Sequence, residues 1–77
     1  MNTLHLTNLG TNQTEVRYGT NYVLFSYSTP VAFSDTEGNC FVTSKFWSKT
    51  TSKHINSWLA GRKATKVSQE VIDNLIK

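Results

Sequence analysis

The hydrophobic period of this chain changes at about Ser44, and this change restricts the possible folds more than any other feature of the sequence. Before Ser44, short runs of β-branched, aromatic and other apolar residues lie between Gly, Asn and Asp turn residues, as in strands joined by tight turns. After Ser44, apolar residues recur at intervals of three and four, the spacing of amphipathic helices. This order predicts an α+β fold, with helices that follow a sheet.

The predicted sheet is small and antiparallel, with three to five strands. Its clearest strand covers residues 21–28, which are rich in aromatic and large apolar side chains. Pro30 interrupts that run, and because proline cannot donate to a strand ladder, a bend, a bulge or a new edge strand begins there. Residues 31–34 and 40–44 flank a five-residue loop, 35–39, with the composition of a hairpin connection. Weaker strand patterns earlier in the chain complete an antiparallel meander.

Two C-terminal helices are expected, packed on one face of this sheet. The first covers about residues 50–60, where Ser48 or Thr50 can cap the start and Gly61 stands where a glycine commonly ends a helix. The second begins after Ser68, a suitable N-cap. The predicted core is Leu24, Phe25, Phe33, Val42, Ile55, Trp58, Leu59, Val71, Ile72 and Leu75.

Length and composition favour one small intracellular domain, residues 1–77. A chain this short buries only about 60% of the surface that its unfolded form exposes, so a large enclosed active site is not expected. Cys40 is the only cysteine, which excludes an intramolecular disulfide and favours a reducing, cytoplasmic setting. No run approaches the roughly 18 apolar residues of a membrane span, so no membrane association is expected.

Positive charge is concentrated in the segment 43–68, which we call the basic segment. It holds six of the eight Lys and Arg residues and both tryptophans, but no Asp or Glu. The net charge of +3 therefore belongs to one part of the chain. Such an asymmetry favours an anionic partner.

We therefore expect a non-catalytic protein that binds DNA or RNA through the basic segment. Its cations would neutralise phosphates, and its rings would stack on bases. In the alternative interpretation, Trp58 belongs to the core, Trp47 closes the end of the sheet and the lysines only keep a helix solvated. The predicted nucleic-acid-binding residues are Lys45, Trp47, Lys49, Lys53, Arg62, Lys63 and Lys66.

The spacing of residues along the chain disfavours a helix-turn-helix motif, a catalytic site and a metal site. The two predicted helices are separated by about seven residues, whereas a helix-turn-helix joins its helices by a turn of roughly three or four. Cys40 and His54, with Asn39 or Asp35, have the residue types of a Cys-His-Asn site, but nothing in the sequence holds them together. His5, His54 and Cys40 lack metal-ligand spacing. We expect no catalytic residue, no metal and no cofactor.

Aromatic residues of the predicted sheet supply a second functional hypothesis. Most of these rings should form the core, and any that stay exposed would mark a protein-binding patch. The chain would then be a protein-interaction module, either a homodimer or an inhibitor of a host protein. The residues concerned are Tyr22, Phe25, Tyr27, Phe33 and Phe41.

The run NYVLFSYSTPVAF and the later VTSKFWSKTTSKHINSWLAGRKATKVSQEVIDNLI resemble a group of short, uncharacterised bacteriophage proteins and domains. That group shares the pattern VLxSYxTPVA…TSKxWSxTTSKHIN, and the resemblance covers residues 21–76. It implies a phage-encoded protein that acts in a bacterial cytoplasm, where small basic proteins often bind nucleic acid or a host protein. It supplies no catalytic residues.

Overall fold

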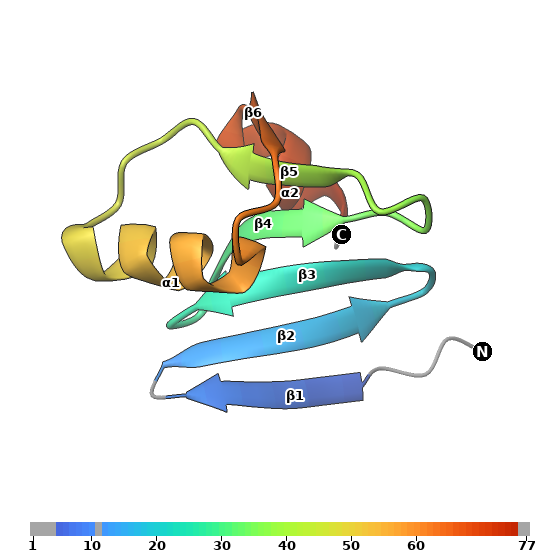
Figure 1. Ribbon diagram of the computed structural model, residues 1–77, viewed down its shortest axis with the longest axis horizontal. Coiled ribbons are helices and arrows are strands. Elements are labelled where there is room, and N and C mark those ends of the chain that lie inside the picture. The colour runs from blue at the N-terminus through green and yellow to red at the C-terminus, as the bar shows by residue number, and fades with distance from the viewer. Residues whose placement is uncertain (1–4, 11, 76–77) are drawn as a thin grey trace.

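The computed structural model describes residues 5–10 and 12–75 and has the predicted α+β fold (Figure 1). Within these described residues, six strands and two helices follow one another. In order they are β1 (His5–Gly10), β2 (Gln13–Tyr18), β3 (Asn21–Ser26), β4 (Thr29–Ser34), β5 (Cys40–Thr43), α1 (Lys49–Leu59), β6 (Ala64–Val67) and α2 (Gln69–Leu75).

The strands form one sheet in the order β1-β2-β3-β4-β5-β6. The first five pair as the predicted antiparallel meander, whereas β6 pairs with β5 in parallel. The sheet is therefore mixed and has one strand more than expected. Parallel neighbours need a crossover connection, and α1 provides it between β5 and β6. Periodicity missed β6 because four residues at a sheet edge are too few to establish a pattern.

Tight turns set the register of the meander. Tyr27 and Ser28 form the turn between β3 and β4, with Tyr27 in the left-handed region at φ 59°. The strand predicted for 21–28 therefore ends at Ser26. Pro30 pairs with Phe25 beside a shift in the β3–β4 register, which agrees with the bulge, one of the three alternatives expected at this proline.

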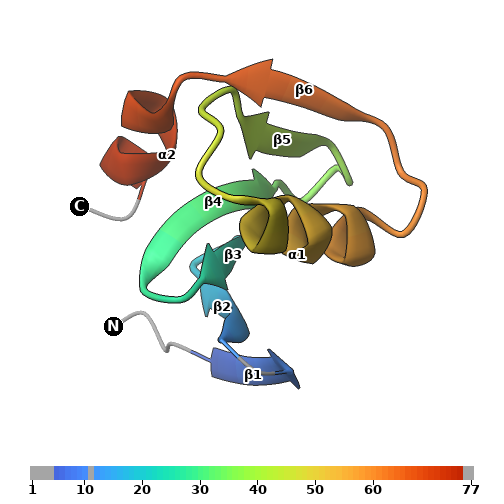
Figure 2. The same cartoon turned by 90° about the vertical axis from the view of Figure 1, so that its left-hand side faces the viewer.

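The two helices lie on opposite faces of the sheet, and the prediction of a single helical face was wrong (Figures 1 and 2). The reason is visible in β3, where the adjacent residues Val23 and Leu24 are both fully buried. Successive strand residues point to opposite faces, so each face of this central strand needs a cover. α1 covers one face and α2 packs against β4 on the other.

The main core lies under α1. Trp58 is buried there with Leu24, Ala32 and Val42, and Ile55 and Leu59 pack against this cluster. The predicted core residue Val71 is instead 47% exposed, because α2 turns its neighbour Ile72 inward. The predicted core residues Phe25, Phe33 and Leu75 are only half-buried. Buried apolar residues that the prediction did not include are Val23, Val31, Ala32 and Cys40.

Candidate functional site

The basic segment displays two aromatic side chains where the chain passes from β5 into α1. Phe46 is 71% exposed and Trp47 is 40% exposed. The helix begins directly after them, because the Ser48 hydroxyl accepts a hydrogen bond from the Thr51 amide at 3.1 Å. Both rings therefore lie at the start of α1.

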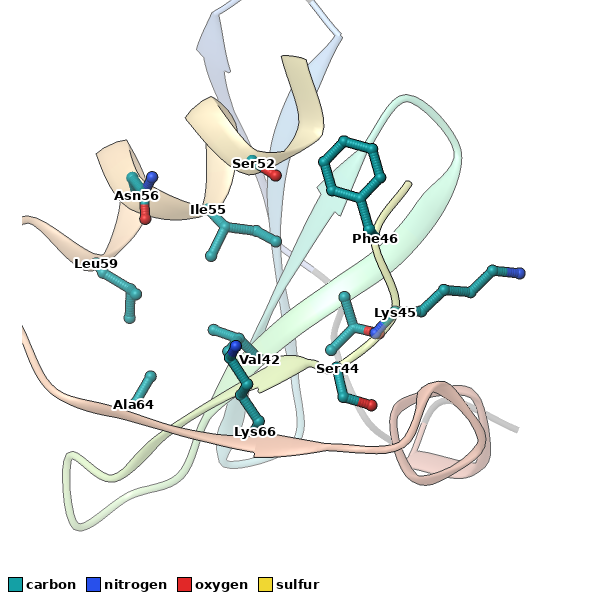
Figure 3. A pocket seen from close by; sticks show the side chains of 11 residues that line it. Val42, Ser44, Lys45, Phe46, Ser52, Ile55, Asn56, Leu59, Ala64 and Lys66 are labelled. Atoms are coloured by element: carbon teal, nitrogen blue, oxygen red, sulfur yellow. The ribbon is translucent and has the colours of Figure 1, made fainter. Parts of the chain in front are cut away.

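A groove of about 430 Å³ lies beside these rings, between α1 and the strands β5 and β6 (Figure 3). We call it the α1–β6 groove. The described residues that line it include two lysines and no carboxylate. They are Val42, Thr43, Ser44, Lys45, Phe46, Ser52, Ile55, Asn56, Leu59, Ala64 and Lys66.

The groove combines an apolar wall with polar side chains from α1. Val42 belongs to the core, and Ile55 and Leu59 pack against it, so their groove-facing surfaces form a fixed apolar wall (Figure 3). Ser52 and Asn56 contribute a hydroxyl and an amide from the same helix. A flat apolar group with a polar edge matches this combination.

The two lysines of the groove differ in direction. Lys66 is opposite Val42 in the parallel β5–β6 register, so its side chain projects toward the face that α1 covers (Figure 3). Lys45 extends away from the groove, and its Nζ lies 4.0 Å from the centroid of the Trp47 ring. That distance is typical of a cation–π contact. One cation therefore lies in the groove and the other at its mouth.

Lys49 and Lys53 extend this cationic region along the exposed side of α1. Lys49 precedes the groove-lining Asn56 by seven residues, so the two share one side of the helix. Lys53 lies one turn after Lys49, and both side chains are exposed. Two of the predicted lysines, Lys45 and Lys66, thus line the groove, and Lys49 and Lys53 lie on the exposed surface of α1.

Arg62 has a different environment. Its Nε donates to the Leu59 carbonyl at 2.9 Å and its Nη2 to the Trp58 carbonyl at 2.8 Å. The guanidinium therefore satisfies carbonyls at the negative end of the α1 dipole. Lys63 and Arg62 line a separate depression with residues of the β4–β5 loop, away from Phe46.

The two tryptophans also have different roles. Trp58 is buried and donates from Nε1 to Glu15 at 2.7 Å, so it is a core residue, as the alternative interpretation held. Trp47 donates from Nε1 to Gln69 at 3.1 Å, and the Gln69 amide donates to the Pro30 carbonyl at 2.7 Å. These bonds connect the displayed indole to α2 and β4.

Sequence reasoning missed a buried polar cluster below α1. The Ser26 side chain is 1% exposed, and its Oγ lies 2.9 Å from Thr51 Oγ1 and 2.8 Å from His54 Nδ1. The only signal was a small polar residue at the end of an apolar strand. His54, considered above beside Cys40, therefore bonds to Ser26 and joins α1 to β3.

Asp35 closes the β4–β5 loop. Its Oδ1 accepts hydrogen bonds from the Glu37 and Asn39 amides, and its Oδ2 accepts one from Asn39 Nδ2. The Asn39 side chain, followed by the Asn39 amide, holds the pKa of Asp35 below its ordinary value of 3.8. The cysteine next in the chain, Cys40, is buried and donates its thiol to the Gly38 carbonyl.

Metal-binding clusters and membrane-spanning helices are both absent from the part of the chain that the structure describes. No three His, Cys, Asp or Glu side chains gather there in a way that could hold a metal ion. In the same residues, no helix is long and apolar enough to cross a membrane.

A protein family of unknown function, DUF8033, matches residues 4–74. The chain belongs to this family. The DUF8033 match spans all six strands and α1, and therefore the α1–β6 groove. Searches of curated proteins and of solved structures found no match to this chain.

Proposed function

We propose that this protein binds nucleic acid, without catalysis, at the α1–β6 groove and the adjoining start of α1. The observation that carries the proposal is that Lys66 and the exposed Phe46 line one groove whose described lining has no carboxylate. Ammonium groups bind phosphates by displacing condensed counterions. Exposed rings offer stacking surfaces to bases.

Four lysines are assigned to phosphate contact: Lys45, Lys49, Lys53 and Lys66. Trp47 supplies a second ring, since it also borders a smaller hollow of about 200 Å³ together with Tyr27. Arg62 is assigned to capping α1 because its guanidinium already bonds to two helix carbonyls. The resemblance to phage proteins and the single cysteine support a further proposal, that the protein is phage-encoded and acts in a bacterial cytoplasm.

The proposal is tested by fluorescence anisotropy with labelled oligonucleotides at several salt concentrations. We expect micromolar binding at low salt that weakens steeply as salt rises. Each neutralised phosphate adds about −0.9 on a duplex, or about −0.7 on a single strand, to the slope of log affinity against log salt. Absence of binding at low salt, or binding that salt does not change, would remove the proposal.

A charge-reversal pair tests the location. Lys49→Glu with Lys53→Glu should abolish binding, because both side chains are exposed on α1, the helix that forms one wall of the groove. Arg17→Glu with Lys63→Glu makes the same change in net charge at two exposed positions that do not line the groove, and should retain most of the affinity. Equal losses in the two variants would mean that net charge alone, and not this site, determines binding.

A protein-interaction module is the second candidate. The observation in its favour is that Phe33 and Phe41 stack, with ring centroids 4.8 Å apart, and remain only half-buried. Their strand positions place them on the face opposite α1. Size-exclusion chromatography with light scattering tests the homodimer: a dimer that Phe33→Ser dissociates would support this candidate, and a monomer would exclude self-association.

A further inference from the structure

We infer that the nucleic acid is single-stranded and that one unstacked base lies in the α1–β6 groove against Phe46. This inference rests on the proposed function. A duplex stacks its bases and presents only their edges in its grooves. An exposed aromatic ring beside an apolar wall can pack against a base whose two faces are not already stacked on other bases.

Phe46 is held in its exposed position by bonds on both sides. On the β5 side, the Ser44 amide donates to the Val67 carbonyl at 2.8 Å. On the α1 side, Trp47 Nε1 donates to Gln69 at 3.1 Å. The loop that carries Phe46 is therefore anchored on both sides, and this anchoring keeps the Phe46 side chain 71% exposed. A large exposed apolar side chain that adjoins further apolar surface indicates a binding surface.

The groove beside Phe46 matches the parts of a nucleotide. Ile55 and Leu59 offer apolar surface to the faces of a base. Asn56 offers an amide donor and acceptor to its edge, and Lys66 brings a cation to the phosphate. The cavity volume of about 430 Å³ falls in the range of small-ligand sites, roughly 300 to 1,000 Å³.

Lys66 also distinguishes the two forms of nucleic acid. A duplex lying along the outer side of α1 would reach Lys49 and Lys53, which are exposed on the helix surface. Lys66 is exposed as well, but it projects from β6 toward the face under α1 and lines the groove (Figure 3). A single strand that inserts a base there brings its phosphate within reach of Lys66. Dependence on Lys66 is therefore expected for single strands and not for duplexes.

The test compares four labelled probes of equal length by fluorescence anisotropy at one low salt concentration. They are single-stranded DNA, single-stranded RNA, duplex DNA and a strand of abasic sites that retains every phosphate. We expect either single strand to bind about tenfold more tightly than the abasic strand, the effect of roughly one stacked base. Comparison of the DNA and RNA probes shows whether the groove distinguishes the two sugars.

Two substitutions with matched controls locate the base. Phe46→Ala should weaken single-strand binding about tenfold and leave abasic binding unchanged, whereas Val71→Ala, at a 47% exposed apolar position on α2, should change neither. Lys66→Gln should weaken single-strand binding more than Lys63→Gln does, since only Lys66 lines the groove.

The outcomes separate the inference from the proposal beneath it. Equal affinity for single-stranded, duplex and abasic probes would overturn the inference and leave nucleic-acid binding in place. No binding to any probe would overturn both. Circular dichroism confirms that each variant is folded, and if Phe46→Ala is not, the abasic comparison on the unmodified protein decides the question.

Discussion

At the scale of single residues, Ser26 shows how one buried hydroxyl positions the helix that carries the candidate site. It bonds to Thr51 and His54, which lie on the buried side of α1. The opposite side of the same turns carries Lys49 and Lys53. Because no described buried side-chain N or O atom lacks a partner, the cluster is fully satisfied. The orientation of the exposed Lys49 and Lys53 side chains therefore depends in part on the buried residue Ser26.

Replacing Ser26 with Ala should destabilise the protein by about 1 to 3 kcal/mol, because Thr51 loses a buried hydrogen bond and His54 Nδ1 loses its partner in a partly buried setting. Ser28→Ala, in the exposed turn that follows, is the control and should change the free energy of unfolding by less than about 0.5 kcal/mol. Urea denaturation followed by tryptophan fluorescence measures both. Similar small effects in the two variants would show that the cluster does not stabilise the fold.

The residue scale also shows what sequence can predict about a site. Composition locates the cations and the rings in the chain, because those are properties of residue type. It did not separate Arg62, which bonds to carbonyls of α1, from Lys66, which projects into the groove. Composition likewise did not predict which of the two tryptophans, Trp47 or Trp58, is exposed and which is buried. These distinctions arise from contacts between residues far apart in the chain, such as the bond of Trp58 to Glu15.

At the scale of elements, the β5–α1–β6 unit creates the groove. The helix crosses the face of the sheet and the chain returns as an edge strand parallel to β5, which leaves a channel between α1 and β6. The strand patterns and both helices were predictable from hydrophobic period. The parallel strand and the second helical face were not, because a short edge strand has no distinctive period and a helix pattern does not state which face it covers.

The β4–β5 hairpin offers a prediction about pH. Hydrogen bonds from Asn39 lower the pKa of Asp35 in the folded protein, so folding favours the charged carboxylate. This stabilisation is present above the ordinary pKa of 3.8 and is lost as the pH falls through the lower folded value. The Asp35→Asn variant should therefore lose less thermal stability than the unmodified protein as the pH falls through the range in which Asp35 becomes protonated.

Glu37→Gln is the control, because the backbone amide of Glu37 keeps its bond to Asp35 after the substitution. It should retain the acid-dependent loss attributed to Asp35. Thermal unfolding by circular dichroism, on either side of the ordinary Asp35 pKa, measures all three proteins. A loss in Asp35→Asn as large as that of the unmodified protein would contradict the role given to this loop.

At the scale of the whole molecule, charge and shape are both asymmetric. The side of the sheet that α1 covers carries Lys49, Lys53 and Lys66, and its carboxylate Glu15 accepts a hydrogen bond from Trp58, while the carboxylates of α2, Glu70 and Asp73, lie on the other face. Such an arrangement attracts an anionic strand to one side and repels it from the other. A chain of 77 residues has little interior, so a shallow groove rather than a deep pocket is the site that it can form.

The central claim, that the groove side is the nucleic-acid-binding face, is tested most directly by NMR. Backbone amide shifts are followed while a short single-stranded oligonucleotide is added at low salt. The account predicts that the largest changes fall in residues 44–52 and in β6 (Ala64–Val67), with a smaller change at Gln69, which bonds to Trp47, and little effect on the rest of α2 and on the strands around Phe33 and Phe41. Largest changes on α2 or beside Phe33 and Phe41 would contradict it.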